Sequence, residues 1–323
     1  MKKGLKIVLI ILLVLAAAVG VSAAVSRIVW HRSLMASVVE LYLRIAWGNR
    51  DMTAEEAEAI LDKKRAEGDA AYSAPGMFFM SNFEELEING LDVLIFSGSD
   101  SPERTIIYIH GGAYVNEITR FHLRFCDKLA KKTNARVMVP IYPLAPNHTF
   151  TETYELVGWV YDKELKRGLP ITLMGDSAGG GFAAAMAMDL AATGNPLPDS
   201  LVLISPWVDV SMSGDYGELA KVDPMLGVDR LIPFGESWAG ELDTKDPLIS
   251  PLFGNAEGLP KTLIFTGTRE IFYGDLEAFY EKLDSAGVDA KLVVGEGMDH
   301  VYPLYPIPEA DRAMKEIVRF ITE

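Results

Sequence analysis

The segment Ile171–Leu190, ITLMGDSAGGGFAAAMAMDL, constrains the fold of this chain more than any other. A short apolar run, Ile171–Met174, precedes the pentapeptide Gly-Asp-Ser-Ala-Gly, and a small-residue apolar run of helical length follows it. This order predicts a strand, a sharp turn and a helix, with Ser177 at the apex of the turn. The glycines two residues before and two after Ser177 suit a crowded turn that leaves no room for a Cβ. We therefore expect a serine hydroxyl that is lifted clear of the backbone as a nucleophile.

A glycine-rich segment can also bind phosphate or serve only as a loop. A phosphate-binding loop ends in Gly-Lys-Ser or Gly-Lys-Thr, and neither sequence follows Ser177. The strand pattern before the pentapeptide and the helix pattern after it favour the nucleophile over a structural loop.

Length and composition allow one large α/β domain or two small ones. The chain has 323 residues, of which 49% are hydrophobic and 23% charged, so it can bury a large core. The formal net charge of -15 argues against nucleic acid as a partner, because neutralising phosphates needs clustered Lys and Arg. The single Cys126 excludes an intrachain disulfide, and we expect it to be buried in a helix.

The amino-terminal segment predicts a location for the protein. Residues 1–6 carry three lysines, and Ile7–Val25 is uncharged and almost wholly apolar. As a helix it would span about 28 Å, close to the hydrocarbon core of about 30 Å. Val21-Ser22-Ala23 also resembles a cleavage site for a signal peptide. We therefore expect a membrane anchor or a signal peptide at residues 1–25, with the body of the protein anchored outside the cytoplasm or secreted.

Alternating strand and helix patterns follow two helical stretches. Residues 33–67 are expected to be helical, with Thr53 as an N-cap, and residues 77–96 predict a hairpin that turns at Asn89-Gly90. The later alternation indicates an α/β fold, a mostly parallel sheet with helices on both faces. The expected strands are Thr105–Ile109, Ala135–Ile141, Ile171–Met174, Leu201–Ile204, Thr262–Thr266 and Lys291–Val294, and the expected helices are Arg120–Lys131, Thr151–Leu165, Phe182–Leu190, Leu276–Ala286 and Glu309–Ile321.

Residues from about 207 to 260 interrupt this alternation. They are rich in Gly, Pro, Trp and Met, and they predict an excursion that covers the site as a lid. We therefore divide the chain after residue 25 into N-terminal cap helices at 26–75 and an α/β domain at 76–323 with a cap insertion at about 207–260.

Ser177 needs a base and an acid that orients the base. Of the five histidines, His300 is the best candidate for the base because it lies in a loop after the last predicted strand. Glu270 is the preferred acid because its loop faces the same edge of the sheet. Asp275 is explained as the N-cap of the next helix, and Asp299 adjoins His300, which seldom allows an orienting geometry. The choice between Glu270 and Asp275 stays open.

The segment His110–Ala113, His-Gly-Gly-Ala, follows a predicted strand and is expected to lie near Ser177. Two adjacent glycines allow backbone N–H groups to point at one position that a side chain would otherwise block. We expect the N–H groups of Gly111, Gly112 and Ala178 to stabilise a tetrahedral oxyanion, each by about 3 kcal/mol.

Together these motifs resemble the hormone-sensitive-lipase-like branch of the α/β-hydrolases from roughly Thr105 to the C-terminus. The segments that carry the resemblance are His110-Gly111-Gly112-Ala113-Tyr114, Tyr142-Pro143-Leu144-Ala145-Pro146, Gly175-Asp176-Ser177-Ala178-Gly179-Gly180, Ser205-Pro206-Trp207, Gly267-Thr268-Arg269-Glu270 and His300. In that family the HGG motif forms the oxyanion hole, the GDSAG motif carries the nucleophile, and N-terminal helices with an inserted segment form a cap. The resemblance therefore implies an α/β-hydrolase fold with a helical cap at Ser33–Glu67 and Trp207–Pro260.

The chain departs from many family members at the acid. They carry Asp-Pro-Leu where this sequence has Glu270-Ile271-Phe272, although some members use Glu. The departure puts the identity of the acid in doubt and leaves the rest of the triad as it is. The apolar amino-terminal segment also resembles that of arylacetamide deacetylase, a membrane-anchored relative, in architecture only.

The residues and the resemblance predict a serine carboxylester hydrolase that acts on short- to medium-chain acyl esters through an acyl-enzyme. Its partner is then a small-molecule acyl ester, with membrane contact only through an uncleaved amino-terminal segment. No metal or cofactor is expected, since no ligands stand at zinc-site spacing. Amide cleavage by an amidase or deacetylase, and a non-catalytic binding protein with the same fold, stay open as alternatives.

Overall fold

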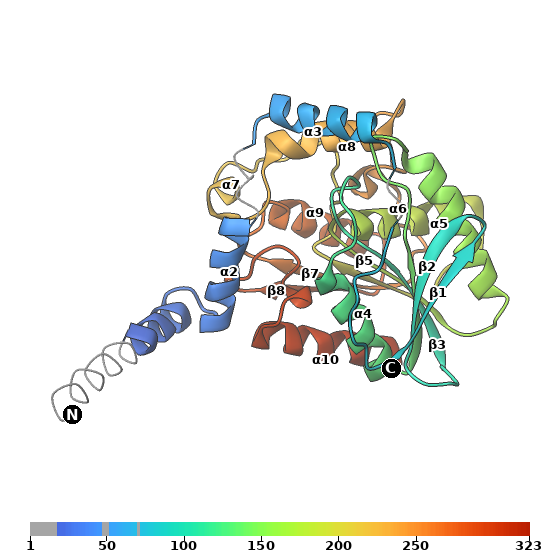
Figure 1. The fold of residues 1–323 in the computed structure, drawn as a ribbon, viewed down its shortest axis with the longest axis horizontal. Coiled ribbons are helices and arrows are strands. Elements are labelled where there is room, and N and C mark those ends of the chain that lie inside the picture. The colour runs from blue at the N-terminus through green and yellow to red at the C-terminus, as the bar shows by residue number, and fades with distance from the viewer. Residues whose placement is uncertain (1–17, 47–51, 70–71) are drawn as a thin grey trace.

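A mostly parallel sheet of eight strands forms the centre of the computed structural model, which describes residues 18–46, 52–69 and 72–323 (Figure 1). The strand order is β1-β2-β4-β3-β5-β6-β7-β8, in which β2 pairs antiparallel with β1 and β4 and all other pairs are parallel. The strands are β1 (Asn82–Ile88), β2 (Leu91–Ser97), β3 (Arg104–Ile109), β4 (Ala135–Pro140), β5 (Ile171–Asp176), β6 (Ser200–Ile204), β7 (Lys261–Gly267) and β8 (Ala290–Gly295). The predicted fold class is confirmed.

Helices cover both faces of this sheet. The helices are α2 (Leu34–Ala46), α3 (Ala54–Glu67), α4 (Arg120–Thr133), α5 (Phe150–Leu165), α6 (Ser177–Thr193), α7 (Leu219–Val222), α8 (Val228–Ala239), α9 (Tyr273–Ser285) and α10 (Pro308–Thr322), with short 3₁₀ turns η2 (Pro251–Phe253) and η3 (Tyr302–Leu304). On one face α4 and α10 contact each other, and on the other face α6 and α9 both contact η2 (Figure 1). The central strands β5 and β6 are therefore buried along their whole length.

Local sequence accounts for two of the predicted boundaries. Asn89 and Gly90 both have positive φ, at 52° and 81°, and they connect the paired residues Ile88 and Leu91 in a two-residue hairpin. Thr53 forms a capping box with Glu56 at the start of α3. The predicted hairpin and N-cap are confirmed.

Elements from two distant parts of the chain cover the carboxyl edge of the sheet. Helix α3, which precedes the first strand, packs against α8, which lies between β6 and β7 (Figure 1). The predicted helical stretch at 33–67 is two helices, and residues 47–51 between them lie outside the described part of the chain.

One helix begins earlier than predicted. Helix α9 starts at Tyr273, so Asp275 lies inside its first turn and is not the N-cap that we expected. Cys126 is buried in α4, as predicted, and burial raises the pKa of its thiol well above the ordinary range.

The predicted localisation, anchored in a membrane or secreted across it, needs correction. Residues 7–17 of the apolar segment lie outside the described residues, and residues 18–28 are helical. Within the described ranges, no helix combines the length and the apolar character that a membrane crossing requires. On this finding the predicted localisation, membrane-anchored or secreted, is wrong.

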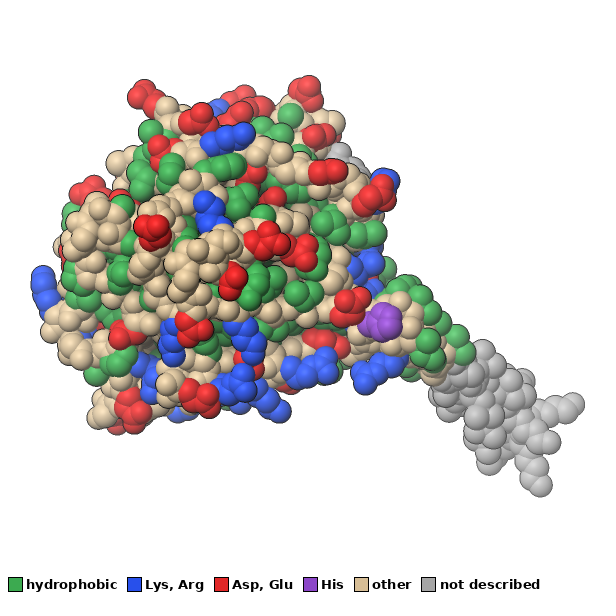
Figure 2. Space-filling model, turned by 180° about the vertical axis from the view of Figure 1, so that it is seen from behind, with side chains coloured by type: hydrophobic (Ala, Val, Ile, Leu, Met, Phe, Trp, Pro, Cys, Tyr) green, Lys and Arg blue, Asp and Glu red, His purple; other side chains and the backbone are tan. Residues whose placement is uncertain are grey.

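Charged side chains of both signs lie across the surface. Figure 2 shows one face of the molecule, on which Asp and Glu side chains are interspersed with Lys and Arg.

Candidate active site

Ser177 lies where β5 ends and α6 begins, as the pentapeptide predicted. Its φ of 51° is in the left-handed region, which is costly for a residue with a Cβ. The turn is tight: a Cβ on Gly175 would lie 2.4 Å from the carbonyl oxygen of Gly179, and a Cβ on Gly179 would lie 2.1 Å from that of Ile109. The two glycines therefore allow the close packing that projects the Ser177 side chain from the edge of the sheet.

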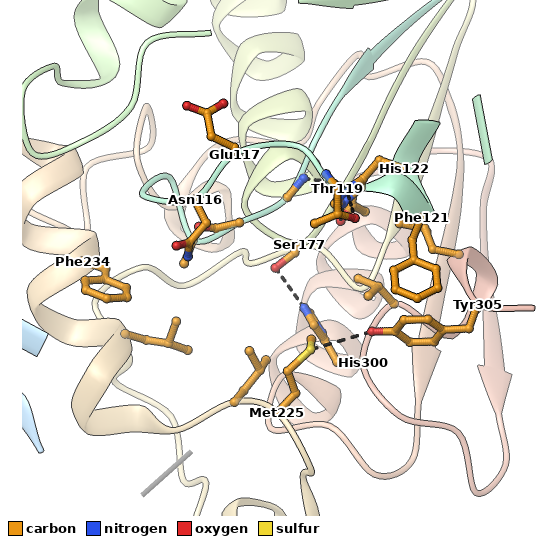
Figure 3. Close-up of a pocket in the computed structure, with 18 of the residues that line it drawn as sticks. Asn116, Glu117, Thr119, Phe121, His122, Ser177, Met225, Phe234, His300 and Tyr305 are labelled. Carbon is orange, nitrogen blue, oxygen red and sulfur yellow. Dashed lines mark hydrogen bonds and ion pairs between the residues drawn. The ribbon is translucent and has the colours of Figure 1, made fainter. Parts of the chain in front are cut away.

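His300 lies between Ser177 and Glu270. The Ser177 Oγ is 2.9 Å from His300 Nε2, and His300 Nδ1 is 2.5 Å from Glu270 Oε2 (Figure 3). Because a carboxylate only accepts, Nδ1–H donates to Glu270, and Nε2 is left to accept the serine proton. His300 and Glu270 are almost fully buried, at 1% and 0% exposed, which keeps water away from the pair.

Three further donors hold the Glu270 carboxylate. Its Oε1 accepts from Ser205 Oγ at 2.8 Å, from Thr266 Oγ1 at 2.7 Å and from the N–H of Gly267 at 2.7 Å. The Ser205 hydroxyl also accepts from the N–H of Val301, at 3.1 Å. Ser205 thus connects the carboxylate to the loop that carries His300. The Ser-Pro-Trp motif was noted in the sequence without this contact.

In the structure, the carboxylate of Glu270 contacts His300, whereas the carboxylate of Asp275 does not. The Asp275 carboxylate accepts from the hydroxyl of Tyr216 at 2.8 Å. Burial raises the pKa of Asp275 to about 6. Asp275 belongs to a separate contact between the cap insertion and α9.

Asp176, immediately before Ser177, holds the loop that follows β3. Its Oδ1 accepts from Tyr108 Oη at 2.6 Å and from the N–H of Gly111 at 3.0 Å, and its Oδ2 accepts from His122 Nε2 at 3.2 Å. The His122 Nδ1 accepts from the backbone N–H of Thr119, so Nε2 carries the proton that is donated to Asp176. Burial alone would raise the pKa of Asp176, but His122 and these hydrogen bonds lower it below its ordinary range.

The contact with Asp176 corrects the prediction for Gly111. Its N–H is already donated to the Asp176 carboxylate, so the expected oxyanion donor at Gly111 is wrong. Among the described residues no acceptor takes the N–H of Gly112, of Ala113 or of Ala178. Ala113, which we did not name as a candidate donor from the sequence, directly follows the two glycines.

His110, at the start of the loop that follows β3, holds this loop in place through two contacts. Its Nδ1–H donates to the carbonyl oxygen of Gly111 at 2.8 Å, and its ring stacks on Tyr142 with centroids 4.4 Å apart. Burial lowers the pKa of His110 to about 4, so the ring is neutral at pH 7. These contacts show that His110 braces the loop.

Ser177 and His300 face a pocket with largely apolar walls (Figure 3). Phe121 and Tyr305 lie on one side of Ser177, and Phe234 of α8 lies on the other. The pocket is lined by Gly111, Gly112, Ala113, Asn116, Glu117, Thr119, Phe121, His122, Asp176, Ser177, Met225, Leu226, Arg230, Leu231, Phe234, His300, Val301, Leu304 and Tyr305. Residues from the segment between β6 and β7 and residues from the sheet-edge loops therefore both shape the space around the hydroxyl.

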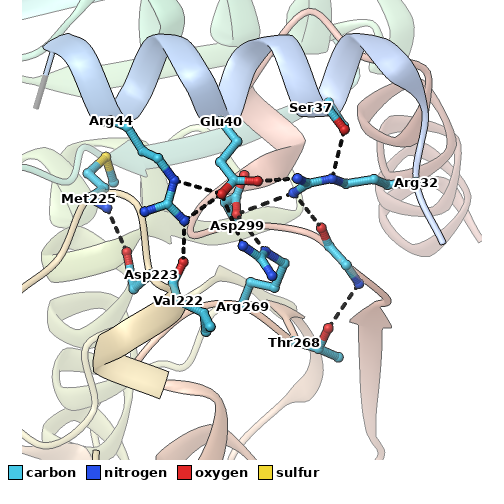
Figure 4. A network of polar contacts seen from close by, with 12 residues as sticks. Arg32, Ser37, Glu40, Arg44, Val222, Asp223, Met225, Thr268, Arg269 and Asp299 are labelled. Atoms are coloured by element: carbon cyan, nitrogen blue, oxygen red, sulfur yellow. Dashed lines mark hydrogen bonds and ion pairs between the residues drawn. The ribbon is translucent and has the colours of Figure 1, made fainter. Parts of the chain in front are cut away.

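A buried cluster of charges joins α2 to the loops after β7 and β8 (Figure 4). Glu40 of α2 accepts hydrogen bonds from Arg32, from Arg44 Nε at 2.8 Å and from Arg269 Nη2 at 3.0 Å. The Arg32 Nη1 also donates to the carbonyl oxygen of Gly297 at 3.2 Å. The amino-terminal helix is thereby fixed to both loops.

Asp299, next to His300, lies at the edge of this cluster. Its Oδ1 is 3.6 Å from Arg269 Nε and 3.8 Å from Arg32 Nη1, and no hydrogen bond reaches it from the described residues. Burial raises the pKa of Asp299 to about 7, and the charge of Glu40 adds to this effect.

Comparisons with known proteins agree with this geometry. The model of the α/β hydrolase fold family matches residues 106–304. An esterase of Acinetobacter venetianus is 31% identical over 229 residues, which cover 69% of this chain and 76% of that protein. An acetyl-hydrolase of Streptomyces hygroscopicus is 32% identical over 224 residues, which cover 68% and 75%. The crystal structure of an esterase from the bacterial hormone-sensitive lipase family matches with a TM-score of 0.76 and 28% identity, covering 90% of this chain and 98% of that one.

The chain belongs to the α/β-hydrolase fold family, in its hormone-sensitive-lipase-like branch. It is a carboxylesterase- or lipase-like hydrolase, and its substrates are small-molecule esters. The predicted family and enzyme class are confirmed.

Proposed function

We propose that the chain hydrolyses short- to medium-chain acyl esters with Ser177 as nucleophile, His300 as base and Glu270 as orienting acid. The observation that carries this proposal is the continuous line of hydrogen bonds from Ser177 Oγ through the His300 ring to Glu270. The three residues come from separate loops at one edge of the sheet, where the fold gathers reacting groups.

The reaction follows from the donors and acceptors. His300 Nε2 takes the Ser177 proton as Oγ attacks the ester carbonyl, and Glu270 stabilises the imidazolium that forms. His300 then gives its proton to the departing alkoxide, which leaves an acyl group on Ser177. A water molecule, activated by the same ring, attacks the acyl carbonyl and releases the acid. The serine regains its proton from His300.

The oxyanion of each tetrahedral intermediate needs N–H donors that nothing else occupies. We propose Gly112 and Ala178, which were expected from the sequence, together with Ala113. The absence of any acceptor for these three amides among the described residues supports this set. Asp176 would act indirectly, because it holds Gly111 and so fixes the start of the loop.

The predicted division of the chain fits this proposal. We propose that residues 26–75 and about 207–260 form a cap over the α/β domain at 76–323. The packing of α3 on α8 and the place of Met225 and Phe234 in the pocket wall support a cap that shapes the substrate site. The pocket has largely apolar walls and is bounded by Phe234 on the side opposite Phe121 and Tyr305, which supports short to medium acyl chains (Figure 3).

A series of p-nitrophenyl esters from C2 to C16 tests the proposal. We expect kcat/KM to be highest for short and medium chains and to fall toward C16. Ser177→Ala should abolish turnover, while Ser101→Ala, at an exposed loop serine, should leave it unchanged. Preference for C16 would contradict the chain length, and full activity of Ser177→Ala would contradict the mechanism. p-Nitroacetanilide, the matching acetyl amide, tests the amidase alternative in the same assay.

A further inference from the structure

Arg230 is a buried cation in the wall of the pocket that contains Ser177. It lies on α8 and is 8% exposed. Phe234 follows it by four residues and therefore lies on the same face of the helix, beside the pocket (Figure 3). Its other neighbours in the wall, Met225, Leu226 and Leu231, are apolar.

Most of the donors of Arg230 have no partner. Its Nη2 donates to the carbonyl oxygen of Met225 at 3.0 Å, and this is its one hydrogen bond to the described residues. Its Nε is buried without an acceptor, and the guanidinium forms no ion pair within the described part of the chain. Buried arginines are normally paired, because removing the charge from water is costly.

A neighbouring carboxylate offsets the charge of Arg230 only in part. Asp223 is the carboxylate whose charge acts on Arg230, and its oxygens accept from the N–H groups of Met225, Leu226 and Ile271. Burial lowers the pKa of Arg230 in spite of that charge, so the compensation is incomplete.

The two other carboxylates at the pocket do not offset this charge. Asp176 is occupied by three donors, and Figure 3 shows the Glu117 carboxylate pointing away from Ser177. Among the described residues, the guanidinium group in this pocket therefore forms no ion pair with a carboxylate.

We infer that Arg230 binds an anionic group of the substrate, so that the preferred esters carry a carboxylate. This inference rests on the proposed function and adds the chemical class of the substrate. A carboxylate matches the fork of guanidinium donors, and Nε and Nη1 are the groups without a partner. The apolar wall around Arg230 strengthens such a pair because it excludes water.

Two matched pairs of esters test the inference. In the first pair, 4-acetoxybenzoate and 4-acetoxybenzamide share the acetyl group and differ in the charge of the leaving side. In the second, monoethyl glutarate and ethyl pentanoate differ in the charge of the acyl side. We expect the wild type to show a higher kcat/KM for the anionic member of at least one pair. That pair identifies the side of the ester on which the anionic group binds.

The variant Arg230→Gln should lower kcat/KM for the preferred anionic ester by about 10- to 100-fold, mainly through KM, because a charge-assisted hydrogen bond is lost. The neutral partner should lose clearly less kcat/KM than the anionic ester, because it makes no charge-assisted hydrogen bond to Arg230. Arg230→Lys should restore part of the preference, since it keeps the charge without the fork. Arg65→Gln, on the surface of α3, is the matched control and should change neither ester.

The outcomes separate the inference from the proposed function. If the wild type cleaves p-nitrophenyl acetate normally but has equal kcat/KM for the two members of each pair, the inference is wrong and the proposed function stands. An equal loss for both members of a pair in Arg230→Gln would also overturn it, because it would show a structural role. Failure of the wild type to cleave any ester would overturn the proposed function. The wild-type comparison decides the question even if Arg230→Gln does not fold.

Discussion

Arg269 Nη2 donates to Glu40 Oε1 at 3.0 Å, which joins two residues that are 229 positions apart in the chain (Figure 4). Arg269 immediately precedes Glu270, and Glu40 lies in the amino-terminal helix α2. The same Glu40 bonds Arg32, which reaches the carbonyl of Gly297 in the loop before His300. Helix α2 therefore contacts the loops of both residues that we propose to act on Ser177.

Glu40→Gln should destabilise the protein and impair the site together. The substitution leaves the buried guanidinium of Arg32, and the partly exposed ones of Arg44 and Arg269, without their shared carboxylate, so we expect the free energy of unfolding to fall by about 3 kcal/mol. We expect kcat to fall more than KM changes, because the loops of Glu270 and His300 lose a common support. Urea unfolding and ester kinetics measure the two effects. Glu241→Gln, at an exposed position, is the control, and equal stability of both variants would contradict the account.

Asp299 should make stability depend on pH. Burial raises its pKa to about 7, whereas an unfolded Asp titrates near 3.9. Between these values the folded protein binds one more proton than the unfolded chain, so stability falls as pH rises. The contribution of Asp299 is thus fully present below about pH 4 and is lost as pH rises through about 7.

Comparison with Asp299→Asn isolates this effect. Relative to the variant, the wild type should lose up to about 4 kcal/mol of unfolding free energy between pH 4 and pH 8. Urea unfolding across this range measures the difference. Parallel pH profiles for the two proteins would show that Asp299 titrates normally in the folded state.

Glu270→Gln and Asp275→Asn distinguish the two carboxylates that the sequence left open. An amide at position 270 cannot stabilise the imidazolium, so we expect kcat to fall by about 10³- to 10⁴-fold with KM little changed. Asp275 bonds Tyr216 and not His300, so its variant should keep kcat within a few-fold. The reverse ranking of the two variants would assign the acid to Asp275.

Gly111→Ala should prevent the correct formation of the loop after β3. The new Cβ would lie 2.3 Å from Asp176 Oδ2 and 2.9 Å from Ser177 Cβ, and neither neighbour is free to move. We expect activity to be lost and the melting temperature to fall. Gly274→Ala, in α9 with no atom within 4 Å of the new Cβ, should leave both unchanged or slightly improved. Normal activity of Gly111→Ala would contradict the contact with Asp176.

Local patterns in the sequence predicted much of the fold and part of the candidate site. Alternating apolar strands and helices are short-range signals, as is the turn around Ser177, and the structure agrees with them. The order of Ser177, Glu270 and His300 placed all three at one edge of the sheet because parallel strands end together.

Long-range contacts could not be predicted in the same way. The use of the Gly111 N–H by Asp176 depends on the distance between β3 and β5, and no local pattern reports it. The pairing of Glu40 with Arg269 likewise depends on how α2 packs. The amino-terminal segment misled for another reason: its apolar length suggested a membrane span, whereas no helix in the described ranges is long and apolar enough to cross a membrane.

Covalent labelling of Ser177 tests the central claim most directly. The intact protein is treated with a fluorophosphonate probe, and the labelled peptide is identified by mass spectrometry. The account predicts one modification, on Ser177, that is absent in Ser177→Ala and strongly reduced in His300→Gln. Labelling of another residue, or equal labelling of Ser177→Ala, would contradict it.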